Sequence, residues 1–134
     1  MAITRKELNP HDYPLTEEKK KNFEKLYEVM NEIRKAYGKP IIITSGVRSE
    51  EDQVRIDSAA GRKPRKSTHI LAAACDVWDR DRQFWNWCID NLKLLEKLGV
   101  YLEDKSFTPS WVHCQIYPPQ SGKRIFIPYF KMTN

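Results

Sequence analysis

Hydrophobic residues recur at steps of three and four along residues 17–37, and this spacing predicts an amphipathic helix. The stripe comprises Phe23, Leu26, Tyr27, Met30, Ile33 and Tyr37. Thr16 can cap the first turn, which carries two glutamates that favour a helix N-terminus. Gly38 and then Pro40 follow the last apolar position, so we expect the helix to end there.

Runs rich in β-branched residues or alternating in polarity predict strands elsewhere in the chain. PIIITSG, residues 40–46, has the composition of a short buried strand. LAAACDVW, residues 71–78, also predicts a strand, although its alanines leave a helix open. Three short strands follow late in the chain, at residues 100–103, 111–117 and 124–130.

Two further helices are expected between these strands. Ser49 and Asp52 have the spacing of a capping box, which would open a helix through about Ala60. Asp79 or Asp81 can start the next helix. Its apolar stripe comprises Phe84, Cys88, Leu92 and Leu95, and Gly99 follows it.

The chain of 134 residues shows no repeat, low-complexity segment or linker. We therefore expect a single domain over residues 1–134, with residues 1–15 as an irregular lead-in. Helices precede antiparallel strands, which predicts an α+β fold in which N-terminal helices pack on a small, mainly antiparallel sheet. No apolar run reaches the roughly 20 residues that cross a bilayer, and the start lacks a secretory signal. We expect synthesis in the cytoplasm and no membrane partner.

The net charge of +5 comes partly from two basic runs, KKK at residues 19–21 and GRKPRK at residues 61–66. The first is typical of a solvated helix surface. The second directly precedes His69 and could border its site. Such runs can bind nucleic acid. No recognition helix and no basic patch interleaved with aromatic residues supports that alternative here.

Three cysteines, Cys75, Cys88 and Cys114, are widely spaced and odd in number. The chain contains no CxxC pair, so neither a zinc finger nor a disulfide framework is indicated. We predict three buried free thiols.

Strand alternation collects polar side chains on one face of the predicted sheet, because successive residues point to opposite faces. Asp76 alternates out of phase with Cys75, and His113 alternates out of phase with Cys114. The apolar set would pack against the helices. The opposite face would then carry Asp76, His113 and Glu103.

His69 lies just before the strand of Asp76, so the same face gathers two histidines and a carboxylate. This set suits a catalytic zinc site, which uses three protein ligands and keeps one position open. Small residues between His69 and Asp76 would let the backbone pass close to the metal. Tight core packing of the alanines is the alternative explanation.

The order of three motifs resembles the D-alanyl-D-alanine carboxypeptidase and murein endopeptidase family, zinc peptidases related to the hedgehog signalling domain. The motifs are SGVRS at 45–49, STHILAAACD at 67–76 and WVH at 111–113. In the family pattern S-x-H-x-x-G-x-A-x-D followed by W-x-H, the matching positions are Ser67, His69, Ala74, Asp76, Trp111 and His113. The resemblance spans about residues 40–117 and is closest to phage, prophage and endolysin-like members.

The resemblance implies a role for each matching residue. His69, Asp76 and His113 would be the ligands of one Zn²⁺. Arg48 and Ser67 would bind the substrate. Arg48 would also stabilise the developing oxyanion, and Ser67 would orient the site. The implied substrate is the peptidoglycan stem peptide, with its D-amino acids, and we expect the protein to act as a monomer.

Two positions depart from the family pattern. Ala72 replaces a glycine that members usually have, which could change how the chain turns beside the metal. Ser110 stands where many members place a glutamate, so the general base must come from elsewhere. Alternation directs Glu103 to the metal face and Asp104 away, so we predict Glu103 as the base. A bulge near these residues would favour Asp104 instead.

The sequence thus predicts a zinc metallopeptidase of carboxypeptidase or endopeptidase type that degrades cell walls. The alternative is a non-catalytic, zinc-containing module of the wall or of a phage particle, which the missing glutamate at Ser110 keeps open. The bond cut can be a terminal D-Ala, an L-Ala–D-Glu linkage or a cross-bridge. Action on the wall would follow lysis, export by another route or delivery in a virion.

Overall fold

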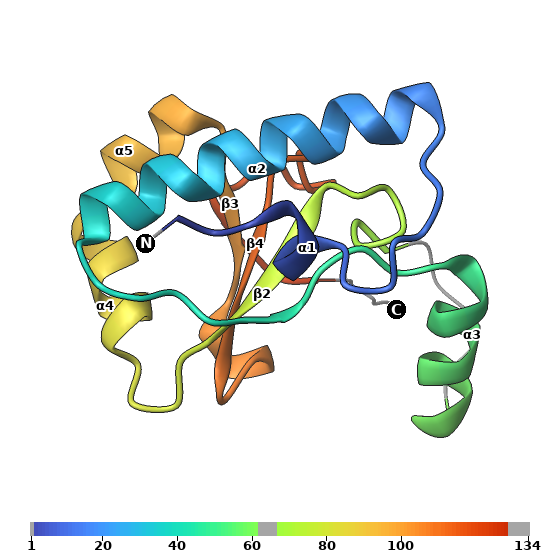
Figure 1. Ribbon diagram of the computed structural model, residues 1–134. Coiled ribbons are helices and arrows are strands. Elements are labelled where there is room, and N and C mark those ends of the chain that lie inside the picture. The colour runs from blue at the N-terminus through green and yellow to red at the C-terminus, as the bar shows by residue number, and fades with distance from the viewer. Residues whose placement is uncertain (1, 62–66, 129–134) are drawn as a thin grey trace.

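The computed structural model describes residues 2–61 and 67–128 of the chain (Figure 1). Its helices are interspersed among the strands along the chain. They are α1 (Arg5–Leu8), α2 (Glu17–Tyr37), β1 (Ile43–Ser45), α3 (Glu50–Ala59), β2 (Ala74–Trp78), α4 (Gln83–Asp90), α5 (Leu92–Leu98), β3 (Tyr101–Glu103), the 3₁₀ helix η1 (Lys105–Phe107), β4 (Trp111–Gln115) and β5 (Ile125–Phe126).

The strands form one five-stranded sheet in the order β1-β2-β4-β3-β5. All neighbours are antiparallel except β3 and β5, which pair in parallel. This confirms the predicted α+β class with a mainly antiparallel sheet. β2 and β4 lie side by side in the centre, and their register pairs Asp76 with His113.

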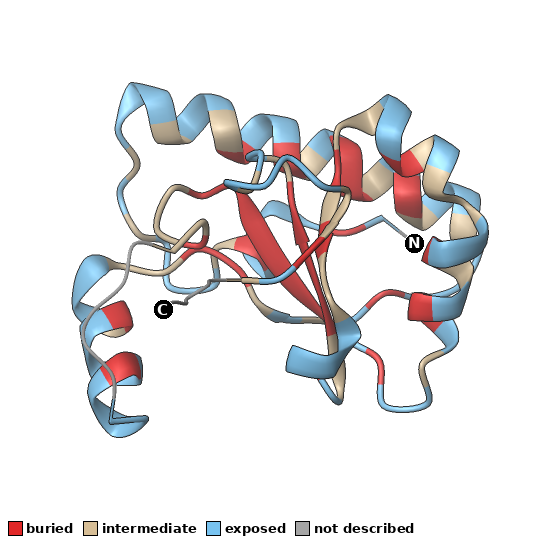
Figure 2. Cartoon of the chain, turned by 180° about the vertical axis from the view of Figure 1, so that it is seen from behind, coloured by how far each residue is buried: buried red, intermediate tan, exposed pale blue. Residues whose placement is uncertain are grey.

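The hydrophobic core lies between α2 and one face of the sheet (Figure 2). Leu26, Met30 and Ile33 of α2 are fully buried, as the predicted stripe requires. From the sheet, this core includes Cys75, Val77, Leu102, Val112 and Cys114. The opposite face of β2 and β4 is therefore left for polar side chains.

The caps of α2 and α3 agree with their predicted sequence signals. The Thr16 side chain accepts a hydrogen bond from the Lys19 amide, and Gly38 ends α2 in the left-handed conformation. The Ser49 side chain accepts from the Asp52 amide at the start of α3. These helices thus begin and end where local chemistry predicts.

The predicted helix after residue 79 is two helices, because the chain breaks between α4 and α5 at Asn91. Both candidate aspartates contribute to its start. The Asp79 carboxylate accepts from the amides of Phe84 and Trp85, each at 2.8 Å, and Asp81 accepts from the Gln83 amide at 3.1 Å.

The lead-in over residues 1–15 is not wholly irregular, which corrects the sequence prediction. Thr4 and Glu7 form a capping box that starts α1, a signal that the sequence analysis overlooked. Ile3 and Leu8 are buried in the core. This segment therefore belongs to the packed structure.

The strand predicted over residues 71–78 is shorter, because residues 68–72 form turns and β2 begins at Ala74. β1 and β5 are also shorter than predicted, and the end of the predicted 124–130 strand lies outside the described residues. Most of the second basic run, residues 62–66, lies outside them too.

Cys75, Cys88 and Cys114 are free and buried, as predicted. Burial raises the pKa of each thiol, so these cysteines stay protonated at neutral pH. Among the described residues, no helix has the length and apolar character to span a membrane.

Candidate metal centre

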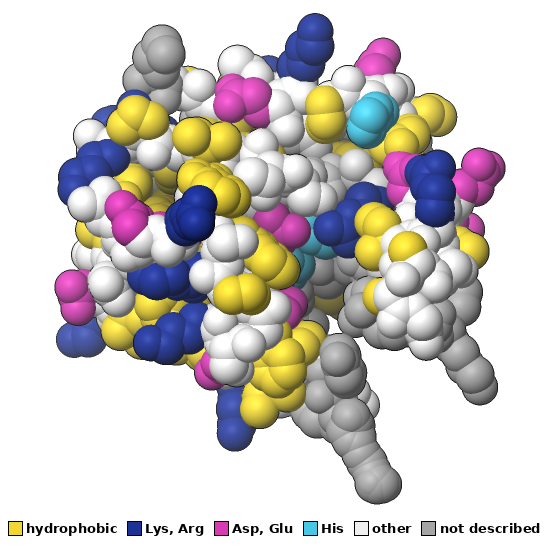
Figure 3. All heavy atoms as spheres, turned by 90° about the horizontal axis from the view of Figure 1, so that it is seen from below, with side chains coloured by type: hydrophobic (Ala, Val, Ile, Leu, Met, Phe, Trp, Pro, Cys, Tyr) yellow, Lys and Arg dark blue, Asp and Glu magenta, His cyan; other side chains and the backbone are white. Residues whose placement is uncertain are grey.

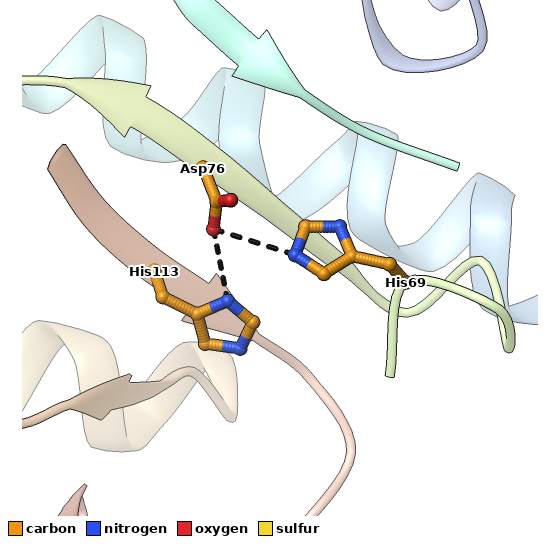
Figure 4. A group of neighbouring side chains, drawn as sticks. All are labelled: His69, Asp76 and His113. Atoms are coloured by element: carbon orange, nitrogen blue, oxygen red, sulfur yellow. Dashed lines mark hydrogen bonds and ion pairs between the residues drawn. The ribbon is translucent and has the colours of Figure 1, made fainter. Parts of the chain in front are cut away.

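The pairing of β2 with β4 brings Asp76 and His113 together, and the turn before β2 adds His69 (Figure 4). His113 Nδ1 lies 2.9 Å from Asp76 Oδ1, and His69 Nε2 lies 3.4 Å from the same oxygen. All three residues are buried, and one ligand atom from each falls within 4.8 Å of the others. The three predicted metal ligands therefore converge.

The ring nitrogen of each histidine that points away from Asp76 lies within hydrogen-bonding distance of a carbonyl oxygen. Such an oxygen only accepts, so we assign the ring proton to that nitrogen. His69 Nδ1 donates to the main-chain oxygen of Gly46 at 2.7 Å. His113 Nε2 donates to Gln115 Oε1 at 2.8 Å. In the neutral rings, His69 Nε2 and His113 Nδ1 then carry lone pairs that face the Asp76 carboxylate.

Two lone pairs aimed at a carboxylate repel one another unless a positive charge lies among them. A proton on a histidine or a bound metal ion can supply that charge. Nitrogen and carboxylate donors suit zinc, and three protein ligands leave a position for water. The residues present therefore fit a catalytic metal site.

The pKa values follow from burial and from the contacts of Asp76. Burial lowers the pKa of His69, so its ring is neutral at neutral pH. Burial also acts to lower the pKa of His113, but the hydrogen bond and charge of Asp76 outweigh it and raise the value. The two histidines hold the pKa of Asp76 below its ordinary value despite burial. Asp76 is thus ionised, the form that binds a metal.

Arg48 lies in the loop between β1 and α3, beside His69, Asp76 and His113. Its Nη2 is 3.7 Å from Asp76 Oδ2 and donates to Ser45 Oγ at 3.0 Å. Its Nη1 donates to Gln53 Oε1 at 3.1 Å, and Gln53 is itself buried and bonded to Asp57. The guanidinium is thereby oriented toward the carboxylate side of the site.

A cleft of about 700 Å³ opens onto these residues, and Figure 3 shows histidine atoms in a hollow beside acidic and basic side chains. Arg48, Ser67, His69, Asp76, Glu103 and His113 all line it. The structure thus brings together every residue that the sequence analysis selected. The apolar residues that line the cleft include Phe107, Trp111, Pro118, Pro119, Phe126 and Ile127.

Glu103 and Asp104 occupy different surroundings. Glu103 is half-buried and lines the cleft, and its charge contributes to the raised pKa of His113. Asp104 does not line the cleft. Its carboxylate instead accepts hydrogen bonds from the amide and hydroxyl of Ser106 at 2.9 and 2.8 Å. These positions favour Glu103 as the proton acceptor.

Sequence reasoning missed the two groups that orient the histidines. Gln115 shares the face of His113 by strand alternation, so that signal could have identified it. Gly46 acts through its main-chain oxygen, and no side-chain pattern reports such a contact. Ser67 lies next to this site, and its hydroxyl accepts a hydrogen bond from the His69 amide at 3.2 Å.

The backbone at Ala72 shows how the chain accommodates one departure from the family pattern. Its φ of +59° lies in the left-handed region, which glycine adopts without steric cost. The alanine completes the same turn between His69 and β2, and its side chain is fully buried. The chain therefore reaches β2 despite the added methyl.

A comparison with protein-family models matches residues 3–115 to the family described as Peptidase M15. The match covers all three candidate ligands, Arg48 and Glu103. Neither the search of curated proteins nor the search of solved structures found a match.

Proposed function

The chain belongs to the peptidase M15 family of metal-dependent peptidases, and on this basis we propose that it uses zinc to hydrolyse peptidoglycan stem peptides. The family makes the chain a metallopeptidase. The metal, the substrate and the bond cut are the parts that we propose. One observation carries the choice of metal site: His69 Nε2 and His113 Nδ1, from two buried rings, converge on the Asp76 carboxylate.

His69 Nε2, Asp76 and His113 Nδ1 would hold the zinc ion. When bound, zinc supplies a Lewis acid for the scissile carbonyl and acidifies a water molecule. The other ring nitrogens donate to carbonyl oxygens of Gly46 and Gln115, which keeps both rings in the ligand tautomer.

Glu103 would take a proton from the attacking water and return it to the leaving amine. Its carboxylate lines the cleft that His113 also lines, and a general base must reach the reacting atoms. Arg48 would stabilise the negative charge that develops on the tetrahedral oxygen, since its guanidinium lies on the Asp76 side of the cleft. Ser67 would hold the turn that carries His69.

The proposed substrate is a stem peptide containing D-amino acids, which rests on the family and on the motifs at residues 45–49, 67–76 and 111–113. The cleft has room for a short peptide, with apolar lining residues for aliphatic side chains and Arg48 for a negative group. We place the protein at the cell wall, reached after lysis, by export or within a virion.

Digestion of purified peptidoglycan tests this proposal. The zinc-loaded protein should release peptide fragments that mass spectrometry identifies, and the chelated protein should release none. The fragments also distinguish a terminal D-Ala, an L-Ala–D-Glu linkage and a cross-bridge as the bond cut. A zinc-loaded, folded protein that leaves every stem peptide intact would refute the peptidase proposal.

The second candidate function is a non-catalytic metal-containing wall or phage module. Ser110 favours it, because many family members have a glutamate at this position, and Ser110 does not line the cleft. That candidate predicts binding to the wall without hydrolysis. Under it, Glu103→Gln would leave both zinc content and wall binding unchanged.

A further inference from the structure

Gly46 lies against the main chain of Leu8, where no side chain can fit. A Cβ atom at Gly46 would stand 2.7 Å from the Leu8 carbonyl carbon and closer still to its oxygen. The next residue, Val47, donates its amide to that same oxygen at 2.8 Å. The glycine is therefore required by close approach of two backbones, since its φ is not in the left-handed region.

The same short loop holds His69 on its other side. The Gly46 oxygen accepts from His69 Nδ1 at 2.7 Å, and the Arg48 amide donates to the His69 oxygen at 3.1 Å. Residues 46–48 thus bond to Leu8 in one direction and to His69 in the other. A shift of this loop would move or release the ring of a metal ligand.

The N-terminal segment, residues 2–8, is itself fixed to α2. The Asn31 side chain accepts from the Ile3 amide at 2.7 Å and donates to the Ile3 oxygen at 3.0 Å. Arg5 donates twice to Glu24, at 2.8 and 2.9 Å. Ile3 and Leu8 are almost wholly buried. This segment therefore offers a rigid support for the loop that it contacts.

We infer that the N-terminal segment is a positioning element of the metal site, acting through Gly46 on His69. The contact with Leu8 fixes the position of the Gly46 carbonyl. That carbonyl accepts a hydrogen bond from His69 Nδ1, so that His69 Nε2 presents its lone pair to the metal. The inference deepens the proposed zinc site but concerns metal binding, so it does not depend on which peptide is cut.

Zinc affinity of the full-length protein provides the test. Gly46→Ala should raise the zinc dissociation constant about 10-fold or more, the usual scale for a lost outer-shell contact to a ligand. In the metal-free variant, ¹⁵N NMR should show His69 losing its single Nδ1–H tautomer. Val100→Ala, a core change at a residue that does not line the cleft, serves as the control and should keep both properties.

Asn31→Ala provides a second test, which is needed if Gly46→Ala does not fold. It removes both hydrogen bonds to Ile3 without touching the cleft, and should weaken zinc binding in the same direction by a smaller factor. Folded Gly46→Ala with wild-type zinc affinity would overturn the inference; if that variant is unfolded, wild-type affinity in Asn31→Ala would do so.

The peptidase proposal fails separately, if the wild type binds zinc but hydrolyses no stem peptide. In that case the effect of Gly46→Ala on zinc affinity would still support the positioning role. A wild type that binds no zinc would refute both.

Discussion

Asp76 and His113 are register partners on adjacent antiparallel strands, and Asp76 Oδ1 lies 2.9 Å from His113 Nδ1. Their neighbours Cys75 and Cys114 are also partners, on the opposite face. One register thus places a pair of candidate ligand side chains in the cleft and a pair of thiols in the core. Two short strands therefore supply two of the three candidate ligands, and the turn before β2 adds His69.

Removal of His113 should remove the metal. His113→Ala leaves two protein ligands, which hold zinc poorly, so elemental analysis should fall from about one equivalent to a small fraction. Cys114→Ala is the matched control, because it changes the next residue on the other face. It should retain the zinc and lose about 1 kcal/mol of unfolding free energy. Zinc loss from a folded Cys114→Ala protein would contradict this assignment.

Glu103 and Asp104 should differ sharply in their effect on turnover. Glu103→Gln should keep the fold and the zinc but lower kcat about 10²-fold or more, because the proton acceptor is gone. Asp104→Asn should change kcat little, since Asp104 bonds Ser106 outside the cleft. Both variants are assayed on one stem peptide with zinc measured in each. Wild-type activity in Glu103→Gln would exclude Glu103 from the mechanism.

Gln115 should control the affinity of His113 for the metal. Gln115→Met has a similar shape but cannot accept the His113 Nε2 proton, so we expect zinc affinity to fall about 10- to 100-fold. Gln115→Glu keeps an acceptor oxygen and should retain more affinity than the methionine variant. Competition with a chelator measures all three dissociation constants. Equal affinities in Gln115→Met and wild type would show that this contact does not orient the ligand.

Zinc affinity should fall as the pH is lowered, and His113 should set where the decline begins. A histidine must lose its proton to bind metal, and the pKa of His113 is raised by Asp76. Protons therefore compete at a higher pH than they would for an ordinary histidine. His69, whose pKa is lowered, and Asp76, which stays ionised, add competition only in more acidic solution.

Chelator competition across about pH 5 to 8, the range in which histidine titrates, measures this dependence. NMR titration of the metal-free protein gives the pKa of each ring for comparison. An affinity that is constant over the whole range would rule out proton competition at His113.

Replacing Ala72 with glycine and replacing Ala73 with glycine should have different effects on the free energy of unfolding. Both are fully buried, so each substitution loses one buried methyl group, about 0.8 kcal/mol. Glycine also adds backbone entropy to the unfolded chain, which costs about 0.4–1 kcal/mol. At Ala72, relief of the left-handed conformation returns about 1–2 kcal/mol, so the net change should be near zero.

Ala73→Gly has no such compensation and should destabilise the protein by about 1–2 kcal/mol. Chemical denaturation of the two variants and wild type gives the comparison. Equal destabilisation in Ala72→Gly and Ala73→Gly would show that the turn at Ala72 carries no strain.

The sequence alone determined features that depend on neighbours a few residues away. The amphipathic stripe and caps of α2, the opposite faces of Asp76 and Cys75, and the cap at Ser49 all follow from local periodicity and hydrogen bonding. The motif order also led to the family and to the three converging side chains. Local spacing is preserved on folding, so these inferences survived it.

Only the tertiary structure decided which main-chain segments meet around the site. The parallel pairing of β3 with β5, the contact of Leu8 with Gly46 and the bond from Gly46 to His69 join residues that are far apart in the chain. Main-chain groups make most of these contacts, and every residue type carries the same main chain. A pattern of side chains therefore gives no sign of them, and the support for His69 became visible only once the backbone was folded.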